Sequence, residues 1–209
     1  MSRQTVFEDL IENPNYPVLI VGGGINGVGL FRELSLQGIN VLLVERGDFC
    51  SGASAAPSRM IHGGLRYLEN REIRLVKESL KERDLLLQNA PHYVRPLPTT
   101  IPIFSWFAGI IPALQKFIFK SDASGNRGAL VVKLGLMLYD RFMQGRSIVP
   151  THYFSSKSTS LAHHPTLSDD IVCTATYYDA SISYPERLCL ELILDTEKAN
   201  TKSHALNYT

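Results

Sequence analysis

The sequence lacks a strong charge of one sign and a cysteine framework. Its 21 basic and 20 acidic residues leave a formal net charge of +1. Without a broad positive field, the composition gives no reason to expect a nucleic acid or another polyanion as partner. The three cysteines, Cys50, Cys173 and Cys189, are odd in number and lack metal-ligand spacing. We therefore expect no disulfide framework, no metal site and a reducing compartment.

A long hydrophobic run is also missing. A membrane-spanning helix needs about 20 consecutive apolar residues. The nearest candidate, Ile101 to Phe119, is interrupted by Pro102 and Pro112 and contains Lys116. Two interpretations stay open for it: a buried loop with a short helix, or a patch on a membrane surface, which Trp106 would suit. The polar N-terminal segment lacks the apolar centre of a secretory signal.

The clearest pattern is one β-α-β unit near the N-terminus. Val18 to Val21 is an apolar run, Ile25 to Gln37 has helical spacing, Gly38 stops the helix, and Val41 to Val44 is a second apolar run. Two strands joined by a crossover helix predict a parallel sheet. The sequence therefore predicts an α/β protein.

Glycines stand between the first strand and the helix in G-x-G-x-x-G register. Gly22 permits the tight turn, Gly24 lets the backbone approach a pyrophosphate, and Gly27 allows close contact of helix and strand. The free N–H groups and the dipole at a helix N-terminus favour a diphosphate there. The predicted cofactor-binding residues of this turn are Gly22, Gly23, Gly24, Ile25, Asn26 and Gly27.

An acidic residue ends the second strand. Glu45 follows Gly27 by 18 residues, close to the roughly 20 expected for the acid that binds a ribose hydroxyl in dinucleotide-binding folds. A carboxylate at this place disfavours the 2'-phosphate of NADP. FAD and NAD both stay open at this point.

Small residues follow Glu45. In the segment from Arg46 to Glu69, small side chains let the backbone approach a ligand, and the hydroxyls of Ser54 and Ser58 can donate hydrogen bonds. The alternative for each serine is a turn or cap.

The same segment and several others resemble the FAD-dependent glycerol-3-phosphate dehydrogenases of the respiratory type. The matching pieces are VGGGINGVG with Glu45, SRMIHGGLRYLE from Ser58 to Glu69, KERDLLLQNAPH, GLMLYDRF from Gly135 to Phe142, and YYD from Tyr177 to Asp179. The chain departs from the family at Ser54-Ala-Ala-Pro-Ser58-Arg59. At this place the family has a serine-rich run followed by a lysine. It departs again at Ser183-Tyr-Pro-Glu-Arg187, where the family has an aspartate-alanine-arginine string.

The resemblance implies a fold and a reaction. The fold is a Rossmann-like FAD-binding domain with a parallel sheet, of the glutathione-reductase kind, incomplete in this chain, plus part of a substrate or cap region. The reaction is oxidation of sn-glycerol 3-phosphate to dihydroxyacetone phosphate by hydride transfer to FAD, with electrons passed to a quinone. The implied FAD contacts extend to Glu45, Arg46, Ser54, Ser58, His62, Gly63 and Gly64.

His62 is the catalytic candidate. A neutral imidazole can accept the proton of the substrate hydroxyl or bond the flavin ring, and Gly63 and Gly64 allow close backbone approach. A structural role is the alternative. Arg59 and Arg66 could pair with phosphate or lie solvated. For Tyr177, Tyr178 and Asp179 the alternatives are strand-end packing and substrate contact.

Other functions also stay open: a glycerol-3-phosphate oxidase that uses oxygen, an amine or amino-acid oxidase, and an inactive fragment. We expect a cytoplasmic protein, with peripheral contact to the cytoplasmic face of the inner membrane and a homodimer as further expectations.

The remaining sequence predicts three segments. Residues 1–93 would be the N-terminal part of the FAD-binding domain, 94–176 an inserted cap with a membrane-facing part, and 177–209 a return toward the FAD domain in a truncated chain. Helical spacing runs from Leu65 to Asn89 and from Ala129 to Met143; Pro96 to Pro112 predicts loop and edge strand, Ser155 to Ser160 a polar loop. Ser183 and Glu186 predict a capping box before a helix from Leu188 to Ala199.

Overall fold

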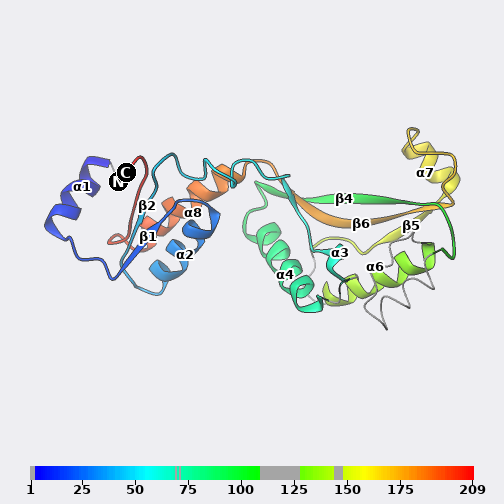
Figure 1. Cartoon of the computed structure of the whole chain (residues 1–209), viewed down its shortest axis with the longest axis horizontal. Helices are drawn as coiled ribbons and strands as arrows, with labels where there is room; N and C mark the ends of the chain where they lie inside the picture. Colours follow the sequence, from blue (N-terminus) through cyan, green and yellow to red (C-terminus); the bar gives the residue numbers. More distant parts are fainter. Residues whose placement is uncertain (1–2, 69, 71, 109–127, 144–147) are drawn as a thin grey trace. The chain divides into compact units, whose positions relative to one another are not determined.

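The computed structural model describes residues 3–68, 70, 72–108, 128–143 and 148–209. The chain forms two compact units, each with its own sheet (Figure 1). The first unit comprises Met1–Arg59 with Ser183–Thr209, and the second comprises Met60–Ile182.

The first unit contains the predicted β-α-β unit. Strands β1 (Val18–Val21) and β2 (Val41–Val44) are parallel, and helix α2 (Ile25–Leu36) connects them. Strand β7 (His204–Leu206) pairs in parallel with the other side of β2, giving the order β1-β2-β7. The predicted strands and parallel sheet are confirmed.

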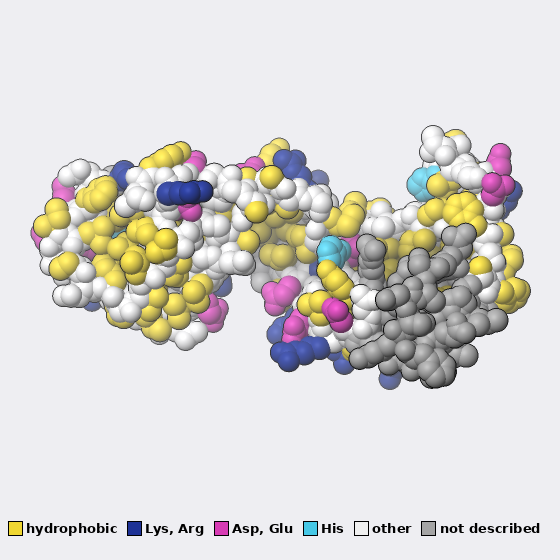
Figure 2. All heavy atoms as spheres, in the orientation of Figure 1, with side chains coloured by type: hydrophobic (Ala, Val, Ile, Leu, Met, Phe, Trp, Pro, Cys, Tyr) yellow, Lys and Arg dark blue, Asp and Glu magenta, His cyan; other side chains and the backbone are white. Residues whose placement is uncertain are grey.

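Two helices share the core of this unit. Val28 and Phe31 of α2 and Ile193 of α8 (Pro185–Ala199) pack in one buried cluster with the sheet residues Ile20, Val41 and Leu43. Each fully buried aliphatic or aromatic side chain contributes about 1.5–3 kcal/mol. The outward-facing residues of β1 are uncovered, since Leu19 is 59% and Val21 81% exposed. Figure 2 shows hydrophobic side chains gathered over this unit, around β1 and α2.

A helix precedes the sheet where the sequence indicated only a polar lead. Helix α1 (Arg3–Glu12) buries Val6, and Asp9 bonds the Nε2 of His204 at 2.6 Å. The guanidinium of Arg3 donates to the carbonyl oxygen of Asn207 at 2.5 Å. These contacts join α1 to the C-terminal strand, so they depend on residues about 200 positions away and leave no local pattern.

The second unit is built around a long antiparallel strand. Strand β6 (Cys173–Ile182) pairs along its whole length with β4 (Val94–Ile103) and, on its other side, with β3 (Met60–Ile61) and β5 (Tyr153–Ser156). The edge strand expected within 96–112 is thus confirmed for β4. Its prolines, Pro96, Pro98 and Pro102, lie on the same side in the alternation of the strand, so three positions on that side lack an N–H donor.

The helices of this unit confirm some predictions and correct others. Helix α6 (Ala129–Met143) has the predicted bounds. The single helix expected from Leu65 to Asn89 is wrong: the structure has a short α3 (Leu65–Leu68) and a separate α4 (Ile73–Asn89). The positive φ of Gly64 and the turn in which the Asn70 N–H donates to the Tyr67 carbonyl oxygen set α3 apart.

Two further local predictions are wrong. The polar loop at Ser155 to Ser160 is the end of β5 and the start of α7 (Lys157–His163), where the Ser156 hydroxyl accepts the Thr159 N–H as an N-cap. The capping box of Ser183 and Glu186 does not form. Helix α8 starts at Pro185, whose fixed φ suits the first helical position, and Tyr184 precedes it without a side-chain cap bond.

The bounds of the compact units differ from those of the three expected segments. Residues 60–93, expected with the FAD-binding part, pack in the second unit, where α4 lies against β4, β6 and α6. The functional labels of the segments remain predictions. In the part of the chain that is described, no helix is long and apolar enough to cross a membrane. Most of the Ile101 to Phe119 run lies outside the described residues.

Candidate functional site

The glycine turn of the first unit has the geometry that a diphosphate site needs. Gly22 has φ +111°, a conformation that side-chain-bearing residues rarely adopt, and its N–H donates to the carbonyl oxygen of Val44 at 2.8 Å. Gly24 precedes α2 as its N-cap and has no side-chain cap bond. The first N–H groups of a helix lack intrahelical partners. Gly24 itself therefore places no side chain over the start of α2.

Gly27 brings the helix against the turn. A Cβ at this position would lie 2.0 Å from the carbonyl oxygen of Gly22, which is backbone and cannot move aside. Two residues further along, a Cβ on Gly29 would meet nothing within 4 Å. Close packing thus requires glycine at residue 27 but not at residue 29.

Glu45 braces this turn. One carboxylate oxygen accepts the N–H of Gly47 at 2.8 Å and the other accepts the N–H of Gly23 at 2.7 Å. These two hydrogen bonds lower the pKa of Glu45, so the carboxylate is ionised at neutral pH. Each oxygen keeps a further lone pair, and Glu45 can therefore brace the turn and still accept a ribose hydroxyl.

The loop after Glu45 returns to the start of α2. The Ser54 hydroxyl accepts the N–H of Ile25 at 3.0 Å, so it lies at the first amide of the helix. Asn26, Arg46 and Ser58 are exposed in this unit. The structure therefore brings the predicted turn residues, Glu45 and Ser54 together, while Ser58 has no described contact with them.

The expectation of no disulfide is wrong. Cys50, which is buried in this loop, is bonded to Cys189 of α8, 139 residues later. The Cys50 N–H also donates to the Gly23 carbonyl oxygen at 2.9 Å. Spacing could not reveal this pair because the fold brings distant residues together. The disulfide links the loop beside the glycine turn covalently to α8.

The predicted catalytic segment lies in the second unit. His62 is exposed, and its ring centroid lies 6.0 Å from that of Tyr67 in α3. Gly63 and Gly64 are buried, and Gly64 has φ +76°. A Cβ on Gly63 would lie 2.1 Å from the Tyr139 hydroxyl oxygen. The segment therefore presents an imidazole on a backbone that is packed too tightly for any larger residue at 63.

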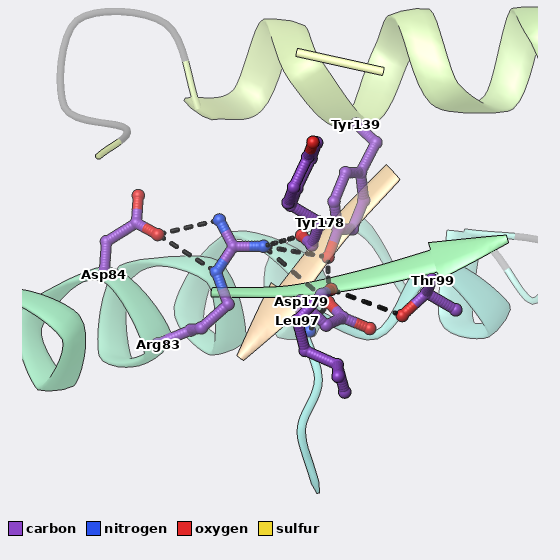
Figure 3. Close-up of polar contacts among 8 residues, drawn as sticks. Arg83, Asp84, Leu97, Thr99, Tyr139, Tyr178 and Asp179 are labelled. Atoms are coloured by element: carbon purple, nitrogen blue, oxygen red, sulfur yellow. Dashed lines mark hydrogen bonds and ion pairs between the residues drawn. The ribbon is translucent and has the colours of Figure 1, made fainter. Parts of the chain in front are cut away.

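Beneath this segment lies a buried polar group that we call the Asp179 cluster: Arg83, Asp84, Tyr139 and Asp179 (Figure 3). One oxygen of Asp179 accepts the Tyr139 O–H at 2.8 Å and lies 3.7 Å from an Arg83 nitrogen. Arg83, fully buried, also donates to Asp84 at 2.7 and 3.0 Å and to the carbonyl oxygen of Tyr178 at 2.7 Å. Helix α4, helix α6 and strand β6 each contribute to the cluster.

Burial keeps the phenols of this region protonated. It raises the pKa of Tyr139 strongly, and the nearby charge of Asp179 raises it further. Burial likewise raises the pKa of Tyr177 to about 12. Tyr139 is consequently protonated at neutral pH and donates its O–H to Asp179.

Sequence reasoning named part of this group. Asp179 was expected either to pack at a strand end or to contact substrate; it lies inside β6 and bonds Gly63. Arg83 and Asp84 of α4 and Tyr139 of α6 were not singled out from the sequence. The available signal was register: Arg83 and Asp84 fall in line with the buried Val76, Leu80 and Leu87. The side chain of Arg66 lies outside the described residues, and Arg59 is exposed.

Comparison with known proteins identifies the family. The family described as FAD dependent oxidoreductase matches residues 17–204. The chain belongs to this family. The match spans both units and includes the glycine turn and the Asp179 cluster.

Similar proteins carry names that specify a substrate, which the description of the family does not. The chain is 37% identical over 198 residues to a glycerol-3-phosphate dehydrogenase of Synechocystis sp., covering 95% of the chain and 32% of that protein. It is 34% identical over 191 residues to the mitochondrial glycerol-3-phosphate dehydrogenase of Saccharomyces cerevisiae, covering 88% of the chain and 26% of that protein. The chain thus spans about a third or less of the length of these relatives.

Solved structures show the same fold. The glycerol-3-phosphate dehydrogenase from Bacillus halodurans complexed with FAD aligns with a TM-score of 0.60 at 21% identity, over 98% of the chain and 29% of that protein. The L-proline dehydrogenase from P. horikoshii aligns with a TM-score of 0.62 at 13% identity, over 93% of the chain and 44% of that protein. The predicted α/β fold of FAD-binding proteins is confirmed.

Proposed function

We propose that this chain binds the diphosphate and adenosine part of FAD at its glycine turn. The described residues fit that group: Gly22 makes the turn, Gly27 brings the helix close, and Gly24 places no side chain over the start of α2. Ionised Glu45 lies beside Gly23 and can accept a ribose hydroxyl. A 2'-phosphate would be repelled by this carboxylate, which favours a dinucleotide without one.

The proposed activity is that of a flavoprotein that oxidises sn-glycerol 3-phosphate to dihydroxyacetone phosphate. The observation that supports this proposal is the 37% identity, over nearly the whole chain, to a protein named glycerol-3-phosphate dehydrogenase. When bound, FAD supplies the acceptor for the hydride that leaves the carbinol carbon of the substrate. In this proposal, the chain's own residues position the cofactor and accept the proton of the substrate hydroxyl.

We assign removal of the substrate's hydroxyl proton to His62. Its exposed imidazole can accept the proton of the substrate hydroxyl, a step that general bases accelerate by about 10²- to 10⁴-fold. Gly63 and Gly64 are assigned to the flavin beside it, as the resemblance to the family implies. Ser58 is exposed and is assigned as a contact of FAD, together with Arg46 and Asn26.

The electron acceptor in this proposal is a quinone, at the cytoplasmic face of a membrane. The relatives at 33–37% identity are named dehydrogenases. One solved structure with the same fold is named as an L-alpha-glycerophosphate oxidase, at 20% identity and a TM-score of 0.58. Turnover with a quinone analogue that produces no hydrogen peroxide supports the proposal. Turnover that produces peroxide in proportion to the substrate consumed contradicts it and identifies oxygen as the electron acceptor.

A matched glycine pair tests the cofactor site. Gly27→Ala forces a Cβ to within 2.0 Å of the Gly22 carbonyl oxygen, whereas Gly29→Ala, in the same helix, meets nothing within 4 Å. FAD binding is measured from the flavin absorbance of the purified protein and by titration of the FAD-free protein. We expect at least about 100-fold weaker binding in the first variant, since the helix must move away from the turn that holds the diphosphate.

The control variant retains the wild-type affinity. A wild-type protein that is colourless and does not bind added FAD contradicts the cofactor proposal. A protein that binds FAD but does not oxidise glycerol 3-phosphate leaves the cofactor site intact and contradicts the proposed substrate.

A further inference from the structure

The peptide between His62 and Gly63 is tied to a buried carboxylate far along the chain. The Gly63 N–H donates to Asp179 Oδ1 at 2.9 Å, across 116 residues of sequence. Asp179 is only 2% exposed. A hydrogen bond from an amide to an ionised, buried acceptor is among the stronger ones in proteins.

Asp179 is itself held in place. Its Oδ1 accepts the O–H of Tyr139 at 2.8 Å, and Arg83 places a positive charge 3.7 Å away. Arg83 in turn is fixed by Asp84 and by the Tyr178 carbonyl oxygen, as Figure 3 shows. The acceptor that Gly63 meets therefore cannot easily rotate away.

This bond fixes the plane of the peptide that His62 shares with Gly63. The described residues contain no cis peptide bond, so the carbonyl of His62 points opposite to the Gly63 N–H, away from the cluster. Gly63 is also wedged against the Tyr139 hydroxyl and Leu80, at distances that exclude a Cβ. On the other side, the positive φ of Gly64 turns the chain toward α3, where Tyr67 flanks the His62 ring.

We propose that Asp179 is a positioning residue for His62, acting through the Gly63 amide, and that Arg83 and Tyr139 hold Asp179 for that task. The part concerning catalysis rests on the function proposed above. The local part does not: it states that removing the Asp179 acceptor frees the His62–Gly63 peptide, whatever the substrate. Asp179 touches no substrate in this proposal.

Amide hydrogen exchange tests the local part without any assay of activity. In the chain labelled with ¹⁵N, Asp179→Ala should accelerate exchange of the Gly63 amide by about 10- to 100-fold, since a hydrogen bond to a charged group is lost. Amides of β4 and β6 should keep their protection, which separates local release from global unfolding. Asp179→Asn keeps an Oδ1 acceptor and should exchange more slowly than the alanine variant.

Two variants complete this experiment. Tyr139→Phe leaves the Gly63 bond but removes one donor to Asp179, so it should give a smaller acceleration; it also serves if Asp179→Ala does not fold. Glu78→Gln removes an exposed carboxylate from the same unit, paired only with Arg74 in the described contacts, and should leave Gly63 unchanged. Wild-type exchange of Gly63 in both Asp179→Ala and Tyr139→Phe overturns the proposal, as does its acceleration in Glu78→Gln.

Turnover in the FAD-loaded protein tests the catalytic part. Asp179→Ala should lower kcat about 10-fold with little change in KM, because misplacing a catalytic group slows chemistry more than binding. In a His62→Ala background the same change should have almost no effect on kcat. Equal losses in both backgrounds overturn the positioning role. Loss of Gly63 protection in a protein with no turnover of glycerol 3-phosphate supports the local part and contradicts only the proposed substrate.

Discussion

The two units hold their candidate site segments by different physical means. In the first unit the glycine turn is shaped by missing side chains and by amides that bond half-buried Glu45, whose two oxygens each keep a lone pair for a ligand. In the second unit the segment of His62 and Gly63 rests on the Asp179 cluster, which is buried and charged. A turn made by backbone tolerates few substitutions within itself, whereas a segment held by a buried cluster depends on residues elsewhere.

Removal of the buried positive charge is the strongest way to test this difference. Arg83→Met leaves Asp84 and Asp179 buried without their cation, and should lower the free energy of unfolding by about 4 kcal/mol in denaturant titrations. Arg74→Met, on the same helix but 92% exposed, should leave the unfolding curve unchanged. Equal effects of the two substitutions would contradict the buried character of the cluster.

Reduction of the disulfide probes the first unit. Opening Cys50–Cys189 releases a covalent link across 139 residues and should lower the free energy of unfolding by about 3 kcal/mol. Thermal unfolding with and without a thiol reductant measures it. In the double variant Cys50→Ser and Cys189→Ser, the reductant should have no further effect. An identical melting temperature of the wild type in both buffers would argue against the link.

The close packing around Gly63 predicts a smaller loss of unfolding free energy. Gly63→Ala places a Cβ 2.1 Å from the Tyr139 hydroxyl and 2.3 Å from a Leu80 methyl, and both side chains must shift. We expect a loss of about 2 kcal/mol, typical of overpacking. Gly135→Ala, in the neighbouring α6, meets nothing within 4 Å and should not destabilise the protein. Denaturant titration of the pair decides whether position 63 is as tightly packed as the distances imply.

The smallest expected effect concerns pH and tests the half-buried carboxylate of Glu45 in the first unit. Hydrogen bonds from Gly47 and Gly23 lower the pKa of Glu45 from the ordinary value of 4.5. Its contribution to stability is therefore present above pH 4.5 and is lost as the pH falls through the lower, folded value. The difference in melting temperature between the wild type and Glu45→Gln should be constant from pH 7 to 5 and shrink below 4.5. A difference that grows on acidification would contradict the sign of the shift.

The sequence predicted the first site better than the second for a physical reason. Gly22, Gly24 and Gly27 lie within one turn and one helix, and Glu45 is reached through a single crossover, so spacing alone places them together. Gly63 meets its acceptor only when β6 returns 116 residues later. Helical register could have indicated that Arg83 is buried, but not which carboxylates it would meet.

Local patterns of residues also gave two wrong predictions. The spacing of Ser183 and Glu186 fits a capping box, yet Pro185 sets the start of α8. The three cysteines show no motif, yet Cys50 and Cys189 meet because α8 packs with α2 on one face of the parallel sheet.

By itself, the sequence determined the β-α-β unit, its glycine turn, the acid at the end of β2 and the resemblance to a flavoprotein family, because all of these are patterns of neighbouring residues. Only the tertiary structure decided the disulfide, the antiparallel sheet around β6 and the buried carboxylate that binds the Gly63 amide. Such contacts join residues from distant parts of the chain, and burial, which gives them their strength, exists only once the fold has excluded water.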